Sequence, residues 1–427
     1  MEKHDLSHLR NLAGRYAEYA HGSPMLERRE KWRLHNRLER RTLPFHIEDN
    51  GTFFKDHTPE LRCTSAEGRW LESRLLWGTI AYEKIDDDRI IPDRFVVDWV
   101  TELSSTCEEL EITRAEDGHG GHLGYETNRP VKDIDADFGK LRKRTITLLK
   151  DATEARAEVA REAFRGFMPV VVGRPSSLYS DGIANKAVHL MGMQELYLQM
   201  AANPAAVHRL FSFLAQDNIA LGAWEEERGL LTTNNDGNQG YCSGSSQFSD
   251  EVPGRAIDAG GKVRTTDRWG YLEAQEATGI SPDMFGEFFM PHFQTLARKF
   301  KLLKFGCCEP VHDLMAHLRK LPGLRKVSVT PWCNQEKLAA VCRRDIIWSR
   351  KPVPLKLCDV TFDPAAFRAH LQETLEFGKD YFVEFVFRDT TRLIGDMEQR
   401  LADACAIVRD ITGHPEGGRS RRTAQAS

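Results

Sequence analysis

From Phe167 onward, short β-rich runs alternate with longer helical patterns, and this alternation constrains the fold more than any other feature of the sequence. The runs are apolar rather than alternating, which is typical of parallel strands covered by helices on both faces. Their positions are 168–173, 230–233, 302–306, 326–330, 345–349 and 381–387. No glycine-rich dinucleotide turn follows any of these runs, which favours a (β/α)8 TIM barrel over a Rossmann sheet.

Helical patterns fill the intervals between the β-rich runs. The longest covers 281–300 and opens with Ser281 as N-cap and Pro282 in the first turn. Others follow Pro310, Asn334 and the Asp363–Pro364 pair, and a last one covers 391–410. We therefore predict a barrel over 161–412, preceded over 1–160 by a mainly helical extension that includes the first barrel elements. The tail 413–427 is predicted to be disordered.

Within the extension, 25–43 has the spacing of an amphipathic helix with a basic, solvated face. The extension is also the expected contact of a homodimer.

Charge and composition exclude several classes of protein. The chain has 427 residues, with 59 lysines and arginines against 63 aspartates and glutamates. A net charge of −4 provides no general field for nucleic acid or an anionic membrane. No stretch approaches the ~18 apolar residues of a membrane span, and the opening residues lack the apolar core of a secretory signal. A soluble, cytoplasmic protein is expected.

The nine cysteines are irregularly spaced, which does not fit a disulfide framework. Most are expected to be small buried hydrophobes. Cys307, Cys308 and Cys333 differ, because they follow predicted strands at the edge where barrel enzymes hold their active sites. Neighbouring side chains on a strand point to opposite faces, so Cys307 and Cys308 can bind one ion only if the chain has already turned.

Other polar residues follow the strands at the same edge. Thiolates with a carboxylate or an imidazole suit zinc with one open coordination position. His312 begins the next helix and is either a capping residue or a substrate-binding group. Arg350 directly follows the strand predicted over 345–349 and is a further substrate-binding candidate. Glu384 lies on the last predicted strand, 381–387.

Two further segments carry candidate substrate-binding groups. The segment 173–182 (GRPSSLYSDG) places Ser177, Tyr179 and Asp181 at a strand end, with a polar turn as the alternative. The segment 267–276 contains Trp269, Glu273 and Gln275, an aromatic residue beside polar groups that suits an organic substrate. Trp269 alone is more typical of a core position. We expect Tyr179, Asp181 and Glu273 to be catalytic and Ser177, Trp269 and Gln275 to bind substrate.

Three segments together resemble the uroporphyrinogen decarboxylase superfamily, which includes zinc-dependent corrinoid methyltransferases. They are GRPSSLYSDG, the helix ISPDMFGEFFMPHFQTLARKF, and FGCCEPVHDLM followed by VSVTPWCN. The resemblance covers about 250 residues and is strongest to an uncharacterised branch with the GCCEP motif.

The resemblance implies zinc held by cysteines and a methyl group carried by a corrinoid on a partner protein. The methyltransferases use a His-x-Cys pair and a later Cys, whereas this chain has Cys307–Cys308–Glu309, and Glu384 stands where their final cysteine lies. The implied ligands are therefore Cys307, Cys308, Cys333 and Glu384.

Three hypotheses remain open. The first is a zinc-dependent methyltransferase that transfers a methyl group between a corrinoid or a methylated small molecule and an acceptor. The second is a metal-free decarboxylase or lyase of a tetrapyrrole or small acid, in which Asp181 or Glu273 stabilises a protonated intermediate. True decarboxylases of the superfamily have an arginine-rich N-terminal motif, which the sequence at Arg15 echoes only by chance. The third is a non-catalytic barrel that binds a corrinoid or a partner protein.

Overall fold

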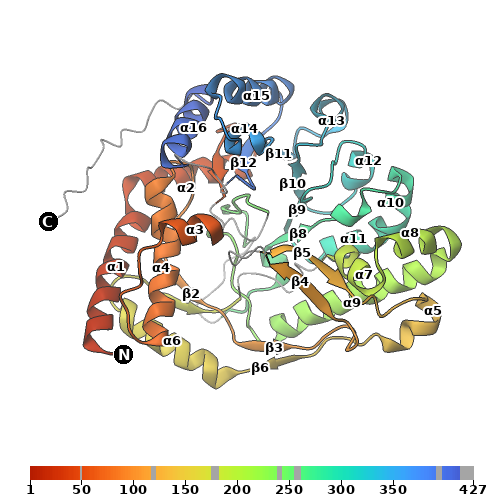
Figure 1. Cartoon of the computed structure of the whole chain (residues 1–427), viewed down its shortest axis with the longest axis horizontal. Helices are drawn as coiled ribbons and strands as arrows, with labels where there is room; N and C mark the ends of the chain where they lie inside the picture. The colour runs from red at the N-terminus through yellow and green to blue at the C-terminus, as the bar shows by residue number, and fades with distance from the viewer. Residues whose placement is uncertain are drawn as a thin grey trace.

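The main structural unit is a parallel sheet of six strands (Figure 1). The computed structural model describes residues 1–48, 51–116, 122–174, 182–237, 243–253, 261–390 and 397–413. All paired strands of the six-stranded sheet run parallel. The order across it is β1 (Phe45–Ile47), β12 (Val383–Phe387), β11 (Ile347–Arg350), β10 (Leu324–Val329), β9 (Leu302–Phe305) and β8 (Trp269–Leu272).

Helices that follow these strands cover the outer face of the sheet (Figure 1). Aromatic side chains make the contact: Phe305 of β9 packs on Phe285 and Phe293, and Phe387 of β12 packs on Phe367. The helices that follow β8 to β12 are α10 (Pro282–Phe288), α11 (Met290–Ala297), α12 (Met315–Leu318), α13 (Gln335–Val341), α14 (Leu355–Cys358), α15 (Pro364–Phe377) and α16 (Met397–Ile411). Three further helices precede β8: α7 (Ile183–Met191), α8 (Met193–Ala202) and α9 (Pro204–Glu227).

The N-terminal part forms a second hydrophobic cluster of its own. Its helices are α1 (Lys3–His21), α2 (Ser23–Asn36), α3 (Gly51–His57), α4 (Ala66–Lys84), α5 (Ile134–Asp137) and α6 (Lys150–Phe164). Strand β2 (Phe95–Val97) pairs in parallel with β7 (Val170–Val172). Two antiparallel pairs complete this part: β3 (Thr101–Leu103) with β6 (Ile146–Leu148), and β4 (Ile112–Glu116) with β5 (His122–Thr127).

The α/β fold class is confirmed, with differences in detail. Five of the six predicted β-rich runs contain strands, whereas 230–233 contributes only a bridge between Leu231 and Arg174. The predicted helix 281–300 is divided into α10 and α11, because Pro291 has no backbone N–H and its ring clashes with the preceding turn. Among the described residues, β2 and β7 are not joined to the six-stranded sheet, so the closed barrel stays a prediction.

Two further expectations concern the chain ends and membranes. The predicted disordered tail lies outside the described residues from 414 onward. In the described ranges, no helix combines the length and apolar character needed to cross a membrane.

The end of α2 differs from the predicted solvated helix, because Trp32, His35 and Asn36 are all buried.

The inner face of the sheet is polar, contrary to the prediction of uniformly apolar strands. Side chains alternate along each strand, so Val327 and Val329 of β10 join the helix-facing core while Lys326 points inward. Lys326 Nζ lies 2.7 Å from Glu384 Oε2 of β12, and Lys304 Nζ lies 3.0 Å from the hydroxyl of Ser349.

The segment 243–253 runs along this inner face from the carboxyl ends of the strands to their amino ends (Figure 1). Its first residue, Ser243, lies beside the strand ends, and Ser245 contacts Lys326 in the middle of the sheet. Glu251 pairs with Arg325 at the strand starts. Gly244 has a φ of +83°, and a Cβ there would lie 2.5 Å from Val386. Only glycine therefore fits this crossing.

Lys326 connects three parts of the chain. Its ammonium donates to Glu384 Oε2, to the Ser245 hydroxyl at 2.9 Å and to the Ser246 carbonyl at 2.9 Å. The rings of Trp32, from α2, and Trp269, from β8, lie 5.3 and 5.6 Å from it. Although burial opposes ionisation, the nearby Lys326 holds the pKa of Glu384 well below its ordinary value.

We expect removal of one partner of this pair to destabilise the protein strongly. Lys326→Met or Glu384→Gln should each lower the free energy of unfolding by about 3–5 kcal/mol, because each leaves a buried group without its partner. Urea denaturation at neutral pH measures this loss. Lys379→Met, which breaks the exposed Lys379–Glu376 pair, is the control and should cost under about 1 kcal/mol. If Lys379→Met lowered the free energy of unfolding as much as Lys326→Met or Glu384→Gln, the buried pair would have no special structural role.

Candidate active site

Two thiols lie side by side at the carboxyl end of β9. The sulfur atoms of Cys307 and Cys308 are 3.6 Å apart. The chain turns at Gly306, whose φ of +101° is readily adopted only by glycine, so the alternation of the strand has ended before the cysteines. This turn meets the condition set by the sequence for both thiols to serve one centre.

A hydroxyl and two cations surround the thiol of Cys307. Ser243 Oγ lies 3.7 Å from Cys307 Sγ. Lys351 Nζ and Arg388 Nη1 each donate to Ser243 Oγ at 2.7 Å. Because that oxygen accepts from both cations, its own hydrogen is directed to the sulfur.

These contacts favour a thiolate on Cys307. The hydrogen bond from Cys308, followed by the charge of Lys351 and the hydroxyl of Ser243, lowers the pKa of Cys307 below its ordinary value, against the effect of burial. The same pairing raises the pKa of Cys308, which therefore keeps its proton. The pair thus holds one negative charge and one S–H group.

Two buried carboxyl groups border the thiols. Glu309 accepts hydrogen bonds from the backbone of Cys307 at 2.8 Å and of Ala274 at 2.7 Å, so it fixes the loops after β9 and β8. Burial, with the charges of Glu276 and Glu309, raises the pKa of Glu273 to about 8. A protonated Glu273 at neutral pH can donate a proton, as a general acid must.

Glu273 also lies close to the start of α7. A Cβ on Gly182 would come within 2.3 Å of Glu273 Oε1, so the absence of a side chain there makes room for the carboxyl group. The predicted site residues Ser177, Tyr179 and Asp181, immediately before Gly182, lie outside the described residues. Their predicted roles remain predictions.

The implied zinc ligands fit only in part. Two sulfurs bound to one tetrahedral zinc at ~2.3 Å would be roughly 3.8 Å apart, which Cys307 and Cys308 nearly match. Glu384 instead accepts from Lys326 and Ser245 in the buried network. The thiol of Cys333 is buried and accepts hydrogen bonds from the backbone N–H groups of Val311 and His312. Burial raises the pKa of this thiol. In the described ranges, no three His, Cys, Asp or Glu side chains are grouped to hold a metal.

The predicted substrate-binding residues lie in different places. Arg350 points away from the inner face and is fixed by the carbonyls of Val329 and Thr330, so the adjacent Lys351 takes the position at the site.

The remaining three predicted residues, Trp269, Gln275 and His312, make other contacts. Trp269 packs in a small buried cluster with Val252 and Leu302. Gln275 contacts Glu273 through its backbone N–H at 3.1 Å. His312 accepts from the backbone of Asn334, the N-cap residue of α13, at 3.3 Å, and its predicted capping or substrate-binding role stays a prediction.

Sequence reasoning did not select Ser243, Lys351 or Arg388. Side chains two residues apart on a strand point to the same face, so Lys351 is expected on the face of Ser349 and Arg350 on the opposite face. This rule could have identified Lys351 as the site residue. Nothing in the sequence near Ser243 marks it, because it belongs to no predicted strand or helix.

Comparisons with known proteins give a likeness of fold. No family model matches the chain, and no curated protein matches its sequence. Among solved structures, a methyltransferase from Methanosarcina mazei is similar, with a TM-score of 0.50 and 12% sequence identity. The match covers 90% of this chain and 98% of that chain. At this identity the likeness shows a shared α/β fold.

We expect alkylating reagents to label Cys307 before Cys308, although Cys308 is more exposed. At pH 7, Cys307 should react with iodoacetamide roughly tenfold faster than an ordinary thiol, because only the thiolate is nucleophilic. Lys351→Met should slow this reaction, whereas Lys356→Met, which removes an exposed lysine, should not. Peptide mass spectrometry measures the order of labelling. Faster labelling of Cys308 would contradict the assignment of the thiolate.

Proposed function

We propose that the protein is a methyltransferase that transfers a methyl group between a corrinoid or a methylated small molecule and an acceptor. The observation that carries the proposal is the Cys307–Cys308 pair at the carboxyl end of a parallel strand, with the Ser243 hydroxyl beside the sulfur of Cys307. Active sites of α/β barrels are built at this end. The fold shared with a methyltransferase from Methanosarcina mazei supports the same class of reaction.

The described residues have distinct roles in this proposal. Ser243 orients the sulfur of Cys307, while Lys351 and Arg388 stabilise negative charge at the centre. When the methyl donor is a methylated small molecule, Glu273 donates its carboxyl proton to the heteroatom that departs with the electron pair of the broken bond. The acceptor takes the methyl group through its own electron pair.

Zinc dependence belongs to the proposal as well. Cys307 and Cys308 would hold the metal. Bound zinc would lower the pKa of an acceptor thiol so that it reacts as a thiolate.

A corrinoid protein is the partner we propose. Three large apolar side chains are strongly exposed after β10 and β11, at the carboxyl ends of the strands, where the thiols also lie. They are Trp332, Leu355 and Val360, with exposures of 74%, 64% and 71%. A partner that covers these side chains would hold its corrinoid near the thiols.

Decarboxylation is the second candidate, and one observation favours it. A protonated Glu273 could protonate the carbon left by a carboxylate substrate, whose carboxylate would bind the cations Lys351 and Arg388 near Cys307. The released product distinguishes the two reactions: carbon dioxide for decarboxylation, and a methylated acceptor for methyl transfer.

The test combines metal analysis with a methyl-transfer assay. Protein purified without chelator should contain about one zinc per chain and should transfer methyl groups from free methylcobalamin to a small thiol. Cys307→Ser and Cys308→Ser should each lose zinc and reduce the rate by at least roughly 10²-fold. Cys342→Ser, a thiol away from the strand ends, is the matched control.

Metal content and methyl transfer test different parts of the proposal. Wild-type protein without zinc or another transition metal would contradict the metal role. Equal methyl transfer by the wild type and by Cys307→Ser would contradict the thiol centre itself.

A further inference from the structure

The two neighbouring thiols at the carboxyl end of β9 are placed to react with each other. The sulfur atoms of Cys307 and Cys308 are 3.6 Å apart, so an approach of about 1.5 Å would bring them to the ~2.05 Å of a disulfide bond. The chain has already turned at Gly306, where φ is +101°. The backbone therefore presents both sulfurs on one side instead of on opposite faces of the strand.

The surroundings of Cys307 are fixed by several contacts. Lys351 Nζ donates to the Cys307 carbonyl at 2.5 Å, and Glu309 accepts from the Cys307 backbone N–H at 2.8 Å. The hydroxyl of Ser243 lies 3.7 Å from the sulfur and accepts from Lys351. Cys307 is therefore the fixed member of the pair.

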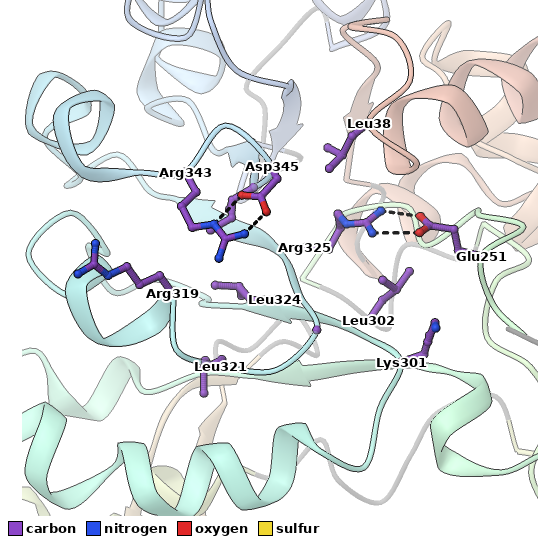
Figure 2. Close-up of a pocket in the computed structure, with 12 residues that line it drawn as sticks. Leu38, Glu251, Lys301, Leu302, Arg319, Leu321, Leu324, Arg325, Arg343 and Asp345 are labelled. Carbon is purple, nitrogen blue, oxygen red and sulfur yellow. Dashed lines mark hydrogen bonds and ion pairs between the residues drawn. The ribbon is translucent and has the colours of Figure 1, made fainter.

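The segment 243–253, which begins with Ser243, is anchored at its far end as well. Glu251 forms a two-bond ion pair with Arg325, at 2.5 and 3.0 Å. Figure 2 shows this pair among the residues that line a pocket of about 360 Å³ at the amino ends of the strands. Because the segment is held at both ends, Ser243 keeps its place beside Cys307.

Cys308 is the member of the pair that can move. Its side chain is exposed, and within the described ranges it makes no hydrogen bond except the one with Cys307. Exposed side chains change rotamer on the picosecond to nanosecond timescale. Cys308 can therefore approach the fixed sulfur of Cys307, and it is also open to a reagent from solution.

We propose that Cys307 and Cys308 are a redox modification site, which a low-molecular-weight disulfide closes into a reversible disulfide between the two neighbouring residues. One cysteine sulfur attacks the reagent, forms a mixed disulfide and releases one small thiol. The other cysteine sulfur then attacks the first, so the bond between the two cysteines forms and the second small thiol leaves. Two electrons and the two cysteine protons end on the two released thiols.

The closed form should be easy to reduce. The Cα atoms of neighbouring residues are about 3.8 Å apart, below the ~4.4–6.8 Å of most disulfides. A disulfide between Cys307 and Cys308 is therefore strained, and strained or exposed disulfides are the labile ones. It also closes no loop of chain, so it adds little stability. These properties fit a switch rather than a structural cross-link.

Closure would remove the reactive sulfur from the centre. Neither sulfur of a disulfide is a thiolate, so neither can act as a nucleophile or as a thiolate ligand. The loss of methyl transfer on closure rests on the proposed function. The closure itself does not, because it needs only the two thiols and the small disulfide.

Peptide mass spectrometry of the full chain tests the proposal, with glutathione disulfide as the probe. Trypsin cleaves after Lys304 and Arg319, so the peptide 305–319 contains both cysteines and no others. After exposure to the probe and blocking of free thiols with iodoacetamide, this peptide should have lost the mass of two hydrogen atoms. It should carry neither glutathione nor the blocking group. Dithiothreitol should restore both thiols.

Single substitutions separate closure from simple modification. In Cys307→Ser and in Cys308→Ser, the mixed disulfide should last at least roughly tenfold longer than in the wild type, because no neighbouring sulfur displaces the glutathione. Cys342→Ser, which leaves both thiols in place, should close as the wild type does. A thermal unfolding curve verifies that each variant is folded.

Two results would overturn the proposal. The first is a wild-type peptide 305–319 that stays unmodified. The second is a wild-type peptide that keeps glutathione as long as the single variants do. The masses do not depend on methyl transfer, so a failure of the proposed function leaves this test unchanged.

Discussion

The buried ion pair between Lys326 and Glu384 is the interaction on which the rest of the structure depends. A parallel sheet normally buries apolar side chains on both faces, yet here the inner face carries charges. Those charges are stable only because every partner is supplied by another part of the chain: Ser245 and Ser246 from the segment 243–253, and the ring of Trp32 from α2. The sheet, the segment and the N-terminal extension are thereby fixed together.

The chemistry at the strand ends follows from this arrangement. Ser243 can reach Cys307 because the residues after it are held against the inner face by Lys326, and because Gly244 allows a close crossing at Val386. Lys351 and Arg388 then converge on one hydroxyl oxygen. The buried charges and the thiol thus contact the same segment two residues apart, at Ser245 and at Ser243.

The sequence predicts the outer half of this structure better than the inner half. Apolar strands, proline-capped helices and the two cysteines after β9 are visible as local patterns. Two things are not local. The inward direction of Lys326 and Glu384 depends on pairing between distant strands, and the position of Ser243 depends on a segment with no regular structure. For the same reason the sequence does not show that Lys351, rather than Arg350, contacts Ser243, or that Glu384 contacts Lys326.

The central claim is that Cys307 carries a negative charge at neutral pH. Thiolate absorbance near 240 nm, followed during an acid titration, measures this charge directly. We expect one thiolate per chain to persist at pH 7 and to disappear only at clearly lower pH, and we expect Cys307→Ser, but not Cys342→Ser, to abolish it. A wild-type chain whose thiolate absorbance appears only near pH 8.5, the range of ordinary cysteines, would contradict the claim.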